Sequence, residues 1–192
     1  GGMSGAQPKA GNIAKCITVC AEVNHKVVQT RHSQGWIDEV FSDIDKLIKR
    51  VKIAKKNKEV VSIAFHGNII TIWKEFYKKN IFIDIGSDQT SLHNPWSGGY
   101  YPYGLDFESA NEMISNEPDL FKSKVKESLL IHAEYINKHC NKGTYFFDYG
   151  NAFLLETSKA GGDVFSKDGV NFKFPSYVQD IMGPMCFDYG FG

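Results

Sequence analysis

The chain opens with a short loop, residues 1–7, that contains three glycines and one serine. Residues 8–16 are mostly small and predict a helix, and the apolar run at 17–21 predicts a buried strand that ends at Glu22. A glycine-rich turn, a helix, an apolar strand and a terminal acid together form the second half of a βαβ unit that binds a dinucleotide. This order constrains the fold more than any other part of the sequence.

In such a unit, particular residues contact particular parts of the dinucleotide. The glycines let the backbone approach a pyrophosphate, and the acid accepts hydrogen bonds from ribose hydroxyls, so Glu22 favours NAD over NADP. The usual G-x-G-x-x-G pattern follows a strand, and Gly1 fits its middle glycine with Ser4 in the third position. We therefore expect the first strand of the sheet to be missing from this chain. The loop alone leaves a second interpretation open, a glycine-rich remnant of an expression tag.

Composition excludes several classes of function. The 22 basic and 22 acidic residues balance, which argues against a general nucleic-acid binder and against a polybasic membrane tail. No apolar run approaches the roughly 18 residues of a membrane span. The four cysteines lack the spacing of a zinc site and predict reduced thiols in a cytosol-like compartment, so we expect a cytoplasmic protein.

Strands and helices alternate as far as residue 85. Buried strands are predicted at 60–65 and 81–85, and helices at 24–32, 37–58 and 69–78. This alternation indicates an α/β fold, a doubly wound, mostly parallel Rossmann-like sheet with helices on both faces. Beyond a loop at 86–104, further elements are expected: helices at 107–116, 119–138, 152–160 and 176–182, a strand at 145–147, and a loop or hairpin at 165–174.

Polar or glycine-rich clusters follow the predicted strands. They are residues 1–7, Glu22, Gly67–Asn68, 88–93 and 148–151. Ligands of open α/β sheets bind outside the carboxyl ends of the strands, so the clusters together predict a dinucleotide cleft. Each is weak alone, since Gly67–Asn68 also fits a simple turn and Tyr149 a packed core aromatic.

Four blocks of the sequence resemble the urocanase family. They are residues 1–8, 88–95, 147–151 and 177–192, they keep the family's order, and the last one, Tyr-Val-Gln-Asp-Ile-Met-Gly-Pro-Met-Cys-Phe-Asp-Tyr-Gly-Phe-Gly, is long and specific. The resemblance implies a Rossmann-like NAD-binding domain at 1–160 and the start of a return segment into a core domain at 161–192. It also implies that the family's active-site Cys lies beyond Gly192, so that Cys186 is a core thiol and no catalytic residue can be named.

The resemblance implies a hydro-lyase. Members add water to urocanate in histidine degradation and form 4-imidazolone-5-propanoate, with a tightly held NAD⁺ that acts as an electrophile. The intact enzyme would be a homodimer in the cytoplasm with no nucleic-acid or membrane partner, and the fragment alone would be inactive. Two alternatives stay open: an NAD-dependent dehydrogenase domain, although no Tyr-x-x-x-Lys occurs, and a dinucleotide-binding module without chemistry.

The family pattern also implies which residues contact the cofactor. They are Gly2, Met3, Ser4, Glu22, Asn68, Ile69, Gln89, Thr90, Ser91, Leu92, His93, Tyr100, Tyr101 and Tyr149. One family contact, an Arg a few residues after the acid, has no match here. Lys26 is a candidate to replace it, and the sequence leaves that position open.

Overall fold

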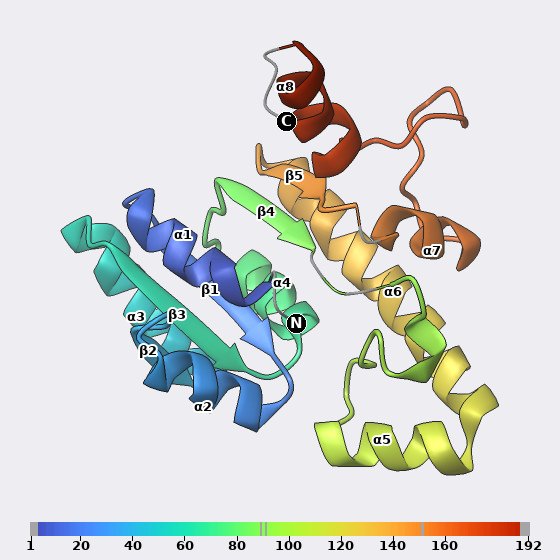
Figure 1. Ribbon diagram of the computed structural model, residues 1–192, viewed down its shortest axis with the longest axis horizontal. Helices are drawn as coiled ribbons and strands as arrows, with labels where there is room; N and C mark the ends of the chain where they lie inside the picture. Colours follow the sequence, from blue (N-terminus) through green and yellow to red (C-terminus); the bar gives the residue numbers. More distant parts are fainter. Residues whose placement is uncertain (1–3, 89, 91, 151, 189–192) are drawn as a thin grey trace. The chain divides into compact units, whose positions relative to one another are not determined.

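The computed structural model describes residues 4–88, 90, 92–150 and 152–188 (Figure 1). The chain forms two compact units. The first unit comprises Gly1–Ile81 and Tyr103–Ser109, and the second comprises Phe82–Pro102 and Ala110–Gly192. These are units of packing, and the division into functional domains at 1–160 and 161–192 stays a prediction.

A parallel sheet lies at the centre of the first unit. Its strands are β1 (Ile17–Glu22), β2 (Glu39–Phe41) and β3 (Val61–His66), in the order β1-β3-β2. β1 and β3 pair over their whole length, so that Glu22 is the partner of His66. The carboxyl ends of these two strands are therefore level, which confirms the predicted parallel arrangement.

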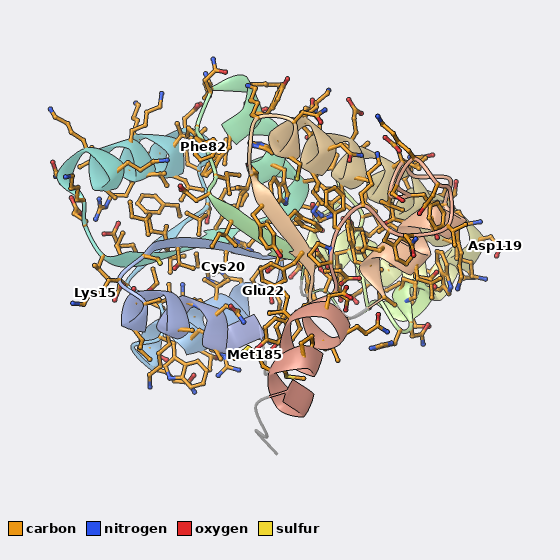
Figure 2. The ribbon with its side chains drawn as sticks, turned by 90° about the horizontal axis from the view of Figure 1, so that it is seen from above. Lys15, Cys20, Glu22, Phe82, Asp119 and Met185 are labelled. Carbon is orange, nitrogen blue, oxygen red and sulfur yellow. The ribbon has the colours of Figure 1, made fainter. Side chains whose placement is uncertain are left out.

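Helices cover both faces of this sheet. After a 3-10 turn at Ser4–Ala6 come α1 (Gln7–Ile13), α2 (His25–Ser33), α3 (Ile44–Asn57) and α4 (Ile69–Lys78). Figures 1 and 2 show α1 and α2 on one face and α3 and α4 on the other. β3 lies between its two neighbours, and its first five residues are buried, as expected for a central parallel strand covered on both sides.

The predicted helix at 37–58 was wrong in its first part. Residues Glu39–Phe41 form β2, which pairs with β3, and the helix begins only at Ile44. The backbone N–H of Asp38 donates to Ser62 O at 3.0 Å, and the Asp43 carboxylate caps α3 by accepting from Asp45 N and Lys46 N. Hydrogen bonds to a distant strand therefore outweigh the helical spacing of the apolar residues at 37–41.

The second unit holds a two-stranded parallel sheet of β4 (Ile85–Asp88) and β5 (Tyr145–Asp148). Among the described residues, parallel pairing thus falls into two separate sheets. The strand predicted at 81–85 was placed too early, because its apolar residues Phe82 and Ile85 are exposed and pairing with β5 starts only at Ile85. The predicted loop at 86–104 therefore begins inside a strand.

The later elements largely follow the predicted order. They are a 3-10 turn (Pro95–Ser97), α5 (Phe107–Asn116), α6 (Pro118–Cys140), α7 (Phe153–Lys159), a π-helix (Tyr177–Met182) and α8 (Gly183–Asp188). The predicted hairpin at 165–174 is confirmed by an antiparallel bridge between Phe165 and Phe172. α6 supplies much of the core of the second unit through buried apolar residues such as Phe121, Val125 and Leu129.

Two apolar residues of α3 offer a matched test of this packing. Leu47 is fully buried, whereas Ile53 on the same helix is 52% exposed. Leu47→Ala should lower the free energy of unfolding by about 2–5 kcal/mol, because the surrounding core cannot fill the space. Ile53→Ala should change it by about 0.5 kcal/mol or less. Urea unfolding of both variants measures these changes in the free energy of unfolding. Equal changes in the two variants would contradict the burial of Leu47 in the core.

Candidate functional site

The carboxyl edge of β1 and β3 holds the acid that the sequence singled out. Figure 2 shows Lys15 and Glu22 at opposite ends of β1, with Cys20 between them. The carbonyl of Glu22 accepts from Gly67 N at 3.0 Å, and its Oε1 accepts from Asn24 N at 2.9 Å. The carboxylate is thus anchored at the edge where ligands of parallel sheets bind.

A cavity of about 60 Å³ lies beside this carboxylate, within the first unit. It is lined by Gly5, Pro8, Cys20, Ala21, Glu22, Val27, Val28, Arg31, Ile37 and Ala64. Glu22 and Arg31 are the charged members of this lining. Burial, followed by the nearby Glu22, raises the pKa of the Cys20 thiol to about 12, so this cysteine is neutral and a poor nucleophile.

The glycine-rich loop reaches the same cavity through Gly5. A Cβ atom on Gly5 would lie 2.6 Å from the Nε of Arg31, so a larger residue would displace the guanidinium. Gly2 and Met3 lie outside the described residues. Ser4 begins the 3-10 turn that precedes α1, and nothing is described of its side chain.

Asn68 and Ile69 follow β3 at the start of α4. The Asn68 side chain caps this helix, with Oδ1 accepting from Ile70 N at 3.0 Å. Gly67 precedes it, and a Cβ there would lie 2.5 Å from the Phe65 ring. Gly67 and Asn68 thus connect β3 directly to α4, and Gly67 lies beside Glu22 through its backbone hydrogen bond.

In the second unit, two buried aspartates end adjacent strands. Asp88 of β4 is the ladder partner of Asp148 of β5, and the two are 3% and 5% exposed. Asp88 accepts from the backbone N–H and the hydroxyl of Thr90, at 2.9 and 3.1 Å. Asp148 accepts from the backbone N–H groups of Gly150 and Leu154. Each carboxyl group thus fixes the loop that follows its strand.

Burial shifts the pKa of three side chains in the second unit, Asp88, His132 and Tyr100. It raises the pKa of Asp88 to about 7, and the neighbouring Asp148 adds to the rise while the bonds from Thr90 oppose it. Burial also lowers the pKa of His132 to about 3 and raises that of Tyr100 well above its ordinary value. At neutral pH the Tyr100 hydroxyl and the His132 Nδ1, 3.2 Å apart, therefore form a neutral hydrogen bond.

The structure assigns different environments to the aromatic and loop residues predicted to contact the cofactor. Leu92 and Tyr100 are buried, whereas His93 is exposed. The Tyr101 hydroxyl donates to Asn111 Oδ1 at 3.1 Å, and Tyr149 stacks on Tyr177 with ring centroids 5.0 Å apart. Two further predicted residues, Gln89 and Ser91, lie outside the described residues.

Of the described residues that were predicted to contact the cofactor, Glu22 lines the cavity, and Asn68 and Ile69 follow the neighbouring strand in the same unit. The second unit holds Thr90, Leu92, His93, Tyr100, Tyr101 and Tyr149. Sequence reasoning missed Arg31, which lies one helical turn after Val27 on α2 and lines the cavity with it. Lys26, the candidate that the sequence left open, is exposed and does not line the cavity.

None of the helices among the described residues combines the length and apolar character needed to cross a membrane. No group of three or more His, Cys, Asp or Glu side chains in the same residues could hold a metal ion. Cys16, Cys20 and Cys140 are free thiols, and the side chain of Cys186 lies outside what is described.

Comparison with known proteins decides the family. The model of the urocanase Rossmann-like domain matches residues 1–181. The chain belongs to the urocanase family. It is 48% identical over 200 residues to urocanate hydratase of Mus musculus, 46% over 199 residues to that of Homo sapiens, and 45% over 196 residues to a probable urocanate hydratase of Caenorhabditis elegans. Each alignment covers 100% of this chain and 29% of the relative, so the chain spans less than a third of these relatives.

Because the pKa of the buried Asp88 is raised, we expect the free energy of unfolding to fall as the pH rises towards neutrality. This pKa of about 7 lies above the ordinary 3.8, so between these values the folded chain binds a proton that the unfolded chain has lost. This contribution to stability is complete below about pH 4 and is lost as the pH rises through about 7.

Asp88→Asn should remove that loss, because the amide resembles the protonated carboxyl and can still bond Thr90. Urea unfolding at several pH values between about 4.5 and 8 measures this effect, because that range covers the titration of the Asp88 carboxyl in the folded chain. Asp119→Asn, whose parent side chain is 96% exposed, serves as the control. Parallel pH profiles for wild type and Asp88→Asn would contradict the assignment.

Proposed function

We propose that this chain is the NAD-binding domain of a urocanate hydratase, an enzyme that adds water to urocanate to give 4-imidazolone-5-propanoate in histidine degradation. The full-length protein would work in the cytoplasm as a homodimer. The single observation that carries the proposal is the cavity at the carboxyl edge of β1, where Glu22 and Gly5 meet in a chain of the urocanase family.

The residues at this cavity fit a dinucleotide. The Glu22 carboxylate is held by one bond, from Asn24 N to Oε1, and can accept further bonds from ribose hydroxyls. Its negative charge opposes a 2′-phosphate, which supports NAD over NADP. The glycine at position 5 keeps a side chain out of the space beside Arg31. When bound, NAD⁺ supplies an oxidised nicotinamide ring that accepts electrons.

The other predicted residues would contact the cofactor. Asn68 and Ile69 would contact it where α4 begins, next to Glu22 in the ladder. Thr90 and Tyr149 belong to loops that Asp88 and Asp148 fix through hydrogen bonds. The remaining candidates are Gly2, Met3, Ser4, Gln89, Ser91, Leu92, His93, Tyr100 and Tyr101.

The reaction class can be tested in the full-length protein that carries this chain. We expect incubation with urocanate to bleach the near-ultraviolet absorbance of the substrate with no net formation of NADH. Accumulation of NADH in step with urocanate loss would instead favour the dehydrogenase interpretation. Full NAD content without any loss of urocanate would support a dinucleotide-binding module without this chemistry.

The ribose assignment has its own test. Glu22→Gln keeps an oxygen that can accept from Asn24 N but removes the charge, so NAD affinity should fall about tenfold or more, as expected for bonds to a charged acceptor. The preference for NAD over NADP should also narrow. Calorimetric titration with both cofactors measures this, and Asp45→Asn on the exposed side of α3 is the control. Unchanged NAD affinity in Glu22→Gln would remove the ribose assignment.

A further inference from the structure

Arg31 occupies an unusual position for a basic residue of a surface helix. Its guanidinium lies over the Trp36 ring, 4.6 Å from the centroid, and its Nη1 donates to Gln34 Oε1 at 3.0 Å. Stacking and this bond restrict the side chain, which would otherwise sample many rotamers. The group is thus held in place before any ligand arrives.

The guanidinium also packs against Gly5 of the glycine-rich loop. Its Nε, Cζ and Nη2 would lie 2.6, 2.9 and 3.0 Å from a Cβ atom on Gly5. Within the described part of the chain, neither Nε nor Nη2 has a hydrogen-bond acceptor. The Nε–H and one Nη2–H lie on the same edge of a guanidinium, and together they can donate to two oxygens of a phosphate group.

Other cations near the cavity do not share this position. Lys26 is exposed and does not line the cavity, and Lys9, 5.6 Å from the centroid of the Trp36 ring, is exposed as well. Arg31 is therefore the positive charge of the lining, with Glu22 as the negative one. The two groups suit different parts of one ligand, since the carboxylate can accept from hydroxyls and the guanidinium can donate to phosphate oxygens.

We propose that Arg31 binds the diphosphate of the dinucleotide and thereby gives this cavity its preference for phosphorylated adenosine over adenosine. This inference rests on the proposed function, since it takes the ligand to be a dinucleotide. The Glu22 charge in the same cavity disfavours a 2′-phosphate, so the bridging diphosphate is the partner assigned to the guanidinium.

The test compares two probes on the 192-residue chain, ADP and adenosine, by titration calorimetry. Arg31→Ala should weaken ADP binding about tenfold or more, the scale of a charge-assisted hydrogen bond, and change adenosine binding less than about twofold. The salt dependence of ADP binding should flatten in the same variant. Lys26→Ala removes the same charge from the same helix and should leave both affinities unchanged.

Each other outcome overturns the inference. Equal losses for ADP and adenosine would make Arg31 a packing residue, and equal losses in Arg31→Ala and Lys26→Ala would indicate a general effect of charge. If Arg31→Ala fails to fold, Arg31→Gln keeps the side-chain stem against Trp36 and gives the same comparison. A wild-type chain that binds neither probe nor NAD would contradict the proposed function itself, whereas unchanged ADP binding in Arg31→Ala contradicts only the role of Arg31.

Discussion

The parallel pairing of β1 with β3 is the constraint on which the candidate site depends. The ladder runs without a gap from Ile17 opposite Val61 to Glu22 opposite His66. Both strands therefore end at the same level, and the polar residues that follow them are brought together at one edge. A shift of one residue in this register would turn the side chains of β1 to the other face of the sheet. The position of Glu22 beside the cavity is thus a consequence of backbone hydrogen bonding.

The second unit uses the same geometry with a different polar group. Its two strands also end level, at Asp88 and Asp148, but both side chains are buried. Their oxygens accept from backbone N–H groups of the following loops, which replaces the contacts with water that a buried carboxyl loses. In both units, carboxyl groups at strand ends thus determine the conformation of the chain that follows.

Much of this arrangement is predictable from the sequence where local and non-local preferences agree. β1, α4 and α5 lie where apolar spacing places them, because each is bounded by a clear signal such as the Asn68 cap. The prediction is wrong at residues 37–41, where helical spacing competes with pairing to β3. The role of Arg31 has no local signature either, since its position depends on contacts with Trp36 and Gly5 that only the folded chain provides.

We propose that the edge of β1 and β3 binds the adenosine half of a dinucleotide. Chemical-shift mapping of the ¹⁵N-labelled chain with NAD tests this binding site, because it reports each backbone N–H separately. Binding at this edge predicts saturable shifts at Gly5, Glu22 and Arg31, which line the cavity, and at Asn68, which follows β3. Shifts confined to residues away from this edge, such as α3 and α8, or no saturable shifts at all, would contradict it.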